Sequence, residues 1–184
     1  MPAFIGDGDD GYTGLLGNER VAKHHIRPHC YGTVDEASAA LGLARSLAQS
    51  EETKTVIRAI RKDLYHLMAE LAAAPGVASR FREIDGRRVG WLEAELHRFE
   101  KMVDVPRDFV LSDDAPAAAA LDLARTVVRR AERLVAQLHH DETLENPHIL
   151  AYLNRLSSMC FILVLWEHHL ASGDAPHLAK EDQP

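Results

Sequence analysis

The chain is poor in the residues that build cross-linked or strand-rich domains. Only 2 of its 184 residues are cysteine, and only 6% are aromatic. Cys30 and Cys160 do not have CxxC spacing, so they indicate no disulfide framework. The alternation of apolar and polar residues that is typical of strands is also missing, except for a short stretch at 2–5. The sequence therefore excludes a disulfide-stabilised scaffold and gives little support to β structure.

Long hydrophobic runs and excess positive charge are missing as well. The longest apolar run, Met159–Trp166, has eight residues, whereas a membrane-spanning helix needs roughly 20. No charged and hydrophobic leader opens the sequence. The 21 Lys and Arg residues face 28 Asp and Glu, a net charge of −7, which disfavours broad nucleic-acid binding but allows a local basic pocket. We expect a cytoplasmic protein that binds neither membranes nor nucleic acid.

Helix-forming residues dominate what is present. Alanine and leucine are abundant, and 46% of the residues are hydrophobic, which favours helices around one sizeable core. In five stretches the apolar residues recur at alternating spacings of three and four, the period of an amphipathic helix. We predict an all-α fold, a single up-and-down five-helix bundle over 1–172, with a disordered tail at 173–184. The predicted helices span about 33–49, 51–74, 88–103, 115–140 and 147–171.

Three sequence signals predict where helices begin. Thr33 and Glu36 have the spacing of a capping box, in which each side chain satisfies a backbone N–H of the first turn. Asp114 and Pro116 suit the start of the fourth helix, and Asn146-Pro147 suits the start of the fifth. Each signal places a hydrogen-bond acceptor or a proline where the first turn has backbone N–H groups without intrahelical partners.

The first thirty residues predict an irregular segment. Glycine recurs at Gly6, Gly8, Gly11, Gly14 and Gly17 among acidic residues, and such flexible backbone lets N–H groups approach a phosphate closely. A lysine follows at 23, a point charge suited to a β- or γ-phosphate. The same pattern also fits a calcium loop or a mobile N-terminus, and no Walker A motif is present.

The predicted fourth helix carries a second signal for an anion. Arg125, Arg129 and Arg133 recur every fourth residue, so their guanidinium groups lie along one face. This face lies beside a seam of small and apolar residues that is typical of a packing surface. The alternative is a solvated face laced with salt bridges. The seam consists of Ala117, Leu121, Ala124, Val128, Ala131, Val135 and Leu138.

Histidines gather near the predicted helix ends, at 24, 25 and 29, at 139, 140 and 148, and at 168 and 169. A metal or haem site is conceivable. Because no pair has a dedicated metal-binding spacing, solvated or capping histidines are the simpler interpretation. We assign no protein ligand to a metal.

Three motifs occur in a fixed order: GDDGYTGLLG at 8–17 with RVAK at 20–23 and YGTVDE at 31–36, RTVVRRAER at 125–133, and YLNRLS at 152–157. Together they resemble the signatures of PduO-type ATP:cob(I)alamin (corrinoid) adenosyltransferases. Weaker similarities at 63–64 and 69–72 fall between them. The resemblance covers about residues 4–170 and marks the chain as a divergent member, with 1–30 as its nucleotide-binding segment.

The resemblance implies a homotrimer that holds ATP and cobalamin at its subunit interfaces. It implies that reduced cobalt attacks the ribose C5′ of ATP, which forms adenosylcobalamin and releases triphosphate, with Mg²⁺ bridging the phosphates. The implied partners are a reductase and a cobalamin-dependent mutase. Fixed cations and backbone donors suit this reaction because the leaving triphosphate gathers negative charge.

Matching positions carry the implied roles. Asp35 pairs with Arg129 across the subunit boundary, and Phe109 presses on the lower face of the corrin, although Phe109 alone could equally be an ordinary core aromatic. The implied catalytic residues are Asp35, Phe109, Arg129 and Arg133. The residues implied to contact ATP are Gly6, Asp7, Gly8, Thr13, Gly14, Lys23, Arg129, Arg130, Glu132, Arg133 and Asn154.

The chain also departs from the family pattern near the implied site. Asp7 adds a carboxylate beside the expected phosphates, which should weaken ATP binding. One alternative is therefore a weakly active or inactive paralogue that carries or senses ATP or cobalamin, and another is a helical assembly module with no small ligand. The departures are Ile5, Asp7, Ser38, the stretch Ser112 to Asp114, Ser158 and Leu165.

Overall fold

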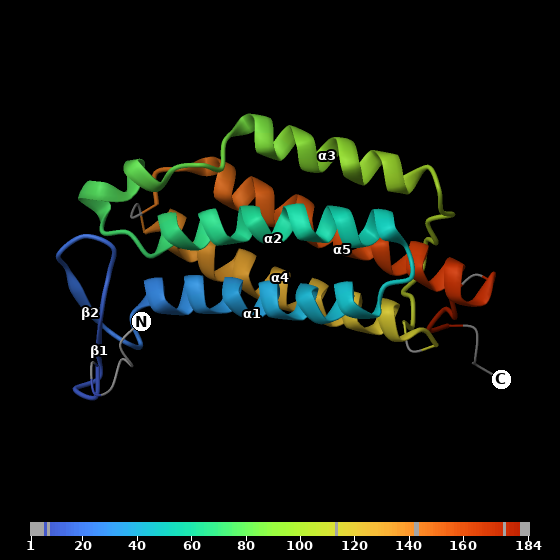
Figure 1. The fold of residues 1–184 in the computed structure, drawn as a ribbon, viewed down its shortest axis with the longest axis horizontal. Coiled ribbons are helices and arrows are strands. Elements are labelled where there is room, and N and C mark those ends of the chain that lie inside the picture. Colours follow the sequence, from blue (N-terminus) through green and yellow to red (C-terminus); the bar gives the residue numbers. More distant parts are fainter. Residues whose placement is uncertain (1–5, 7, 113, 142–143, 175, 181–184) are drawn as a thin grey trace.

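Five long helices make up most of the computed structural model, which describes residues 6, 8–112, 114–141, 144–174 and 176–180 (Figure 1). The helices are α1 (Ile26–Leu47), α2 (Glu51–Leu71), α3 (Gly86–Glu100), α4 (Pro116–His140) and α5 (Pro147–Ser172). A 3-10 helix, η1 (Pro75–Phe81), precedes α3, and strands β1 (Tyr12–Gly14) and β2 (Arg20–Ala22) form an antiparallel hairpin before α1. The prediction of a five-helix bundle is confirmed.

Apolar seams decide which helices are neighbours. Helix α1 packs against α2 and α4, α5 packs against α4 and α3, and the hairpin lies at the end of the bundle where α1 begins (Figure 1). The predicted seam of α4 is buried along its whole length. Burial of that seam fixes which face of α4 remains exposed to solvent.

Helix α5 is the most apolar element. It is the one helix in the described part of the chain that is long and apolar enough to cross a membrane, but 61% of its apolar window is buried inside the bundle. Ile162, Leu163, Val164 and Leu165 all lie in the core. Burial within the bundle therefore accounts for this composition.

The predicted start of the first helix is wrong. Helix α1 begins at Ile26, and the ring Nδ1 of His25 accepts a hydrogen bond from the Arg27 N–H at 3.2 Å. Thr33 lies buried two turns inside the helix and caps nothing. Pro28 is tolerated because the first turn does not use its N–H groups within the helix. The start at Ile26 could not be predicted, because the residues between His25 and Thr33 show no apolar periodicity and include a proline.

The N-terminal hairpin was also missed, because strands of only three residues are too short to show an alternating pattern. The segment at 2–5, where a strand was considered, lies outside the described residues. The Leu16 N–H donates to Ala72 and the Leu16 carbonyl accepts from Ala74, each at 2.9 Å. This pairing, with the Arg27 guanidinium bound to the carbonyls of Leu71 and Ala73, ends α2 at Leu71 rather than near 74.

Other helix boundaries agree more closely with the sequence. Asn146 caps α5 through a hydrogen bond from the His148 N–H at 3.0 Å, and Pro147 occupies its first turn, as predicted. Pro116 likewise begins α4, but the capping residue is Ala115 and makes no side-chain capping bond. Asp114 instead lies 3.7 Å from the His177 ring.

A buried polar cluster ties three helices together. The hydroxyl of Tyr152 donates to Asp63 at 2.7 Å, and Arg88 donates to the same carboxylate through Nε at 3.1 Å and also through Nη2. Asp63 and Tyr152 are both buried. Burial and the adjacent Asp63 charge raise the pKa of Tyr152 well above its usual value, so its hydroxyl remains a donor.

Replacement of Asp63 by alanine tests this cluster. We expect Asp63→Ala to lower the free energy of unfolding by about 2–4 kcal/mol, because the Arg88 charge and the Tyr152 hydroxyl both lose their acceptor. Urea unfolding followed by circular dichroism measures the change. The matched control is Asp104→Ala, which removes an exposed carboxylate. A loss below about 1 kcal/mol for Asp63→Ala would show that water replaces the carboxylate.

Candidate functional site: two clefts in one protomer

The first cleft lies beside the β1–β2 hairpin and has a volume of about 620 Å³. Gly8 has a φ of +93°, and a Cβ there would lie 3.1 Å from Cε and Nζ of Lys23. Only glycine therefore allows this backbone turn and the close approach of the lysine. The cleft is lined by Gly6, Gly8, Asp10, Tyr12, Thr13, Gly14, Arg20 and Lys23.

Some charged side chains of this cleft have a partner of opposite charge among the described residues, and one does not. Arg20 donates two hydrogen bonds to Asp10, at 3.0 and 3.1 Å, and this guanidinium lowers the pKa of the exposed carboxyl. No carboxylate in the described part of the chain pairs with the Lys23 ammonium. The cleft thus presents one uncompensated cation among glycine backbone, which suits a phosphate and not a calcium ion.

The arginines of α4 differ in their partners. Arg125 binds Asp122 at 2.8 Å, and Arg130 pairs with Glu36 of α1. Arg133 donates to the backbone carbonyl of Arg129 at 3.1 Å. Among the described residues, no side chain pairs with the Arg129 guanidinium. The predicted arginine face therefore combines structural ion pairs with cations that remain available to a ligand.

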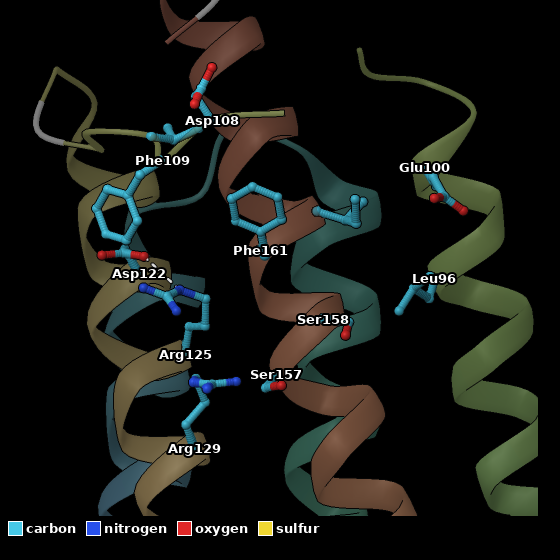
Figure 2. Close-up of a pocket in the computed structure, with 12 residues that line it drawn as sticks. Leu96, Glu100, Asp108, Phe109, Asp122, Arg125, Arg129, Ser157, Ser158 and Phe161 are labelled. Atoms are coloured by element: carbon cyan, nitrogen blue, oxygen red, sulfur yellow. Dashed lines mark hydrogen bonds and ion pairs between the residues drawn. The ribbon is translucent and has the colours of Figure 1, made fainter. Parts of the chain in front are cut away.

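The second cleft, of about 610 Å³, lies between α3, α4, α5 and the segment before α4. Figure 2 shows the Phe109 and Phe161 rings along it, with the guanidinium groups of Arg125 and Arg129 further down α4. The Phe109 side chain is 67% exposed, so it is not an ordinary core aromatic. This cleft joins an apolar aromatic surface to two arginines. Its other lining residues include Leu96, Glu100, Asp108, Asp122, Ser157, Ser158 and Ile162.

The segment that carries Phe109 is held by the C-terminal residues. Residues 176–180 fall in the range predicted to be a disordered tail, yet they pair with 109–111 in an antiparallel bridge. The Leu111 N–H donates to the His177 carbonyl at 2.8 Å, and the Ala179 N–H donates to the Phe109 carbonyl at 2.9 Å. Lys180 also binds Asp108 at 2.7 Å. The bridge constrains the backbone from the Phe109 carbonyl to the Leu111 N–H, and the ion pair holds Asp108 on the other side of Phe109.

The residues predicted to bind ATP fall into two groups. Gly6, Gly8, Thr13, Gly14 and Lys23 line the hairpin cleft, whereas Arg129 lines the Phe109 cleft. Asn154 donates to Glu132 at 2.9 Å and so links α5 to α4. Asp35 is exposed on α1, and Asp7 lies outside the described residues. Neither of these two clefts contains both groups.

Several lining residues were missed as site candidates. Arg125 was predicted to share one helix face with Arg129, but it was assigned no contact to a ligand. Phe161 lies four residues after Ser157 and so shares its face of α5, but its apolar surroundings favoured a core position. Asp122 gave no signal of its own, whereas Arg20 belongs to the RVAK motif at 20–23 but was assigned no contact to ATP. These residues line clefts because separate elements converge there.

The cysteines and histidines take no part in either cleft. Burial raises the pKa of the Cys30 and Cys160 thiols to about 12, so both stay protonated at neutral pH and are poor nucleophiles. Within the described ranges, no three His, Cys, Asp or Glu side chains come together in a metal-binding group. His25 is a helix cap, as the simpler interpretation expected.

The fold and the two clefts define a helical bundle that presents a glycine-lined cation cleft and an arginine-aromatic cleft. The family model described as "Cobalamin adenosyltransferase" matches residues 3–167. The chain therefore belongs to the cobalamin adenosyltransferase family.

Individual relatives support this membership. The chain is 39% identical to a corrinoid adenosyltransferase of Mycobacterium bovis, covering 85% of this chain and 83% of that protein. It is 35% identical to the corrinoid adenosyltransferase PduO of Salmonella typhimurium, of which it covers 59%. Against the PduO protein of Citrobacter freundii it covers 50%. The chain thus spans between half and three-fifths of these two longer relatives.

Solved structures show the same fold. A variant PduO-type ATP:corrinoid adenosyltransferase from Lactobacillus reuteri, complexed with cobalamin and ATP, superposes with a TM-score of 0.86 at 27% identity, over 97% of this chain and 99% of that chain. A second variant from that organism, complexed with ATP, also superposes with a TM-score of 0.86. The bundle therefore matches a fold that has been solved with both ligands.

Deletion of the chain from residue 176 onward tests the bridge to the Phe109 segment. We expect the Leu111 amide to exchange with deuterium about tenfold faster, because it loses its acceptor on His177. Native-state hydrogen exchange read by NMR measures this rate. Lys180→Ala is the matched control, since it removes the ion pair and keeps both backbone hydrogen bonds. Equal Leu111 rates in the deleted and full chains would contradict a constraining role.

Proposed function

We propose that this protein transfers the 5′-deoxyadenosyl group of ATP to reduced cobalamin, forming adenosylcobalamin and releasing triphosphate. The observation that carries the proposal is the pair of clefts. One offers glycine backbone and the Lys23 ammonium, and the other offers the Arg129 guanidinium beside the exposed Phe109 ring. Neither cation pairs with a side chain among the described residues. The first suits a polyphosphate, and the second suits a large apolar ring system that carries polar groups.

The proposed reaction needs charge stabilisation and positioning, with no protein nucleophile. As the cobalt electron pair forms a bond to C5′, the bond from C5′ to the triphosphate oxygen breaks and its electron pair leaves with the triphosphate. Lys23, Arg129 and Arg133 hold the phosphates and stabilise the charge that develops on them. Asn154 and Glu132 lie hydrogen-bonded to each other beside this group and contribute polar contacts to the nucleotide.

Phe109 acts on the corrin. Its exposed ring occupies the space below the macrocycle and displaces the axial ligand, which makes the cobalt easier to reduce. The antiparallel bridge to 176–180 supports this role, because the Phe109 carbonyl and the Leu111 N–H are both hydrogen-bonded to its backbone. A ring on a constrained segment can exclude a ligand at smaller entropic cost than a ring on a free loop.

Mg²⁺ accompanies ATP in the proposal. Among the described residues, Asp10 is the one carboxylate that lines the hairpin cleft, and it is already bound by Arg20. The ion is therefore held chiefly by the phosphates, as is usual for nucleotide-bound Mg²⁺, with the Thr13 hydroxyl as a nearby oxygen. When bound, it neutralises phosphate charge that Lys23 alone would not balance.

The complete site requires a second copy of the chain. We propose a homotrimer in which Asp35 of one protomer pairs with Arg129 of its neighbour and joins the hairpin cleft of one to the Phe109 cleft of the other. The side chains of Asp35 and Arg129 make no hydrogen bond or ion pair with any other described residue of their own protomer. Their opposite charges and available atoms are what an intersubunit pair needs.

An exposed apolar patch supports self-association. Helices α1 and α4 run antiparallel (Figure 1), and Glu36 of α1 pairs with Arg130 of α4. Leu43 lies seven residues after Glu36, and Leu123 lies seven residues before Arg130, so the two leucines lie on the same side of the helix pair. They are 51% and 54% exposed. Exposed leucines on one side of a helix pair offer apolar surface that a second copy of the chain can cover.

The proposed reaction also defines what must act before and after it. Reduction of the cobalt has to precede the transfer, which calls for a reductase, and a cobalamin-dependent mutase would consume the adenosylated product. Neither partner is required for a test with purified components.

The direct test mixes the protein with ATP, Mg²⁺ and chemically reduced cobalamin. We expect a light-sensitive cobalt–carbon product, detected by its absorbance change, and a melting temperature raised by ATP and by cobalamin. Thermal stabilisation without product would favour the alternative of a cofactor carrier or sensor. Absence of both effects would favour an assembly module with no small ligand.

A mixing experiment tests the shared site. We expect Lys23→Ala and Arg133→Ala each to lose turnover at least about tenfold with the trimer intact, because each removes a charge-assisted contact to phosphate. When the two variants are unfolded, mixed and refolded together, about a quarter of the interfaces should combine intact halves and restore turnover.

The control for the mixing experiment is Arg80→Ala, which removes an exposed arginine on η1 and should behave like the unmodified protein. Size-exclusion chromatography with light scattering verifies the assembly of each sample. No recovery in well-formed mixed trimers would place both residues in one protomer's site and would refute the shared arrangement.

A further inference from the structure

A third cleft, the α1–α2 groove, has no part in the function described above. It has a volume of about 420 Å³ and runs between α1 and α2. No described carboxylate lines it. Its polar and basic lining consists of Ser38, Arg45, Arg58, Arg61, Lys62 and His66.

The charge of this groove contrasts with the rest of the chain. The protein carries a net charge of −7, and arginines elsewhere, such as Arg82 and Arg98, each bind two carboxylates. Arg58, Arg61 and Lys62 form no ion pair with any carboxylate in the described ranges. Neighbouring like charges without counter-charges repel one another. An anion that enters the groove relieves this repulsion, so its binding there is electrostatically favourable.

Arg61 is held in place within the groove. Its Nε donates to the Ser38 hydroxyl at 3.4 Å, and a Cβ on Gly42 would lie 3.0 Å from its Nη1 and 3.1 Å from its Cζ. The guanidinium therefore lies against the α1 backbone where a side chain would displace it. An arginine positioned in this way loses less freedom when it binds a ligand than one extended into solvent.

The groove continues the α1 face that carries Asp35. Asp35, Ser38, Gly42 and Arg45 follow one another at spacings of three, four and three, so they share one side of the helix. In the proposed trimer, Asp35 pairs with the partner subunit's Arg129, which lines the Phe109 cleft of that partner. The pairing therefore brings the α1–α2 groove of one protomer towards the Phe109 cleft of the next.

We propose that the α1–α2 groove binds a phosphate group of a substrate or product at the edge of the shared site, an inference whose placement rests on the proposed function. Guanidinium forks, an ammonium and a hydroxyl around one space form a donor set suited to phosphate oxygens. Two sources carry that chemistry. One is the phosphodiester in the nucleotide loop of cobalamin, and the other is the triphosphate released from ATP.

The test compares three ligands on two variants of the assembled protein. The probes are cobalamin, cobinamide, which is a corrinoid without the nucleotide loop and its phosphate, and inorganic triphosphate. Arg61→Met removes the positioned charge, and Gly42→Ala keeps the charge but displaces the guanidinium. Arg80→Met is the matched control for loss of a surface arginine. Equilibrium dialysis gives each dissociation constant, and light scattering gives the assembly state.

If the corrinoid supplies the phosphate, both variants should bind cobalamin about tenfold more weakly, the effect of losing a charged hydrogen bond, and should bind cobinamide unchanged. If the nucleotide supplies it, both should lose affinity for triphosphate alone. Unchanged affinities, equal weakening of all three ligands, or loss of assembly would each overturn the proposal. Failure of the proposed function would be distinguished from failure of this proposal, because the unmodified protein would then form no alkyl-cobalt product.

Discussion

Burial of the α4 seam is the constraint on which the site depends. Leu121, Val128 and Val135 are fully buried along one side of the helix, and full burial of each such side chain stabilises the fold by about 1.5–3 kcal/mol. Rotation of α4 by a fraction of a turn would expose the seam. Arg129 directly follows Val128, so the packing that buries Val128 also fixes the direction in which the arginine projects. The core thus determines the geometry of the charged face.

The ion pairs distinguish cations that are neutralised within the protein from cations that can bind a ligand. Arg130 and Arg125 on α4 are neutralised by Glu36 and Asp122. The Arg130–Glu36 pair lies on the surface, where an ion pair contributes little to stability. Arg129 and Lys23 have no such partner among the described residues. In a chain with more acids than bases, cations that remain unpaired within clefts indicate where anions bind.

Irregular segments complete the clefts that the helices begin. The β1–β2 hairpin provides the glycine backbone near Lys23, and the bridge between 109–111 and 176–180 holds the segment of Phe109. Both depend on backbone hydrogen bonds between short stretches, which are weak alone and stable where the bundle supports them. This division is common in proteins, where a rigid scaffold positions loops that carry function.

The sequence by itself determined the helices and their faces. The three-four periodicity, Asn146 and Pro147 are local signals, and the arginine spacing on α4 follows from helix geometry alone. Only the tertiary structure decided that Asp63, Arg88 and Tyr152 meet, that Phe109 is exposed beside 176–180, and that Arg61 lies against Gly42. These contacts join residues far apart in the chain, and their geometry depends on how whole helices pack, which no local pattern encodes.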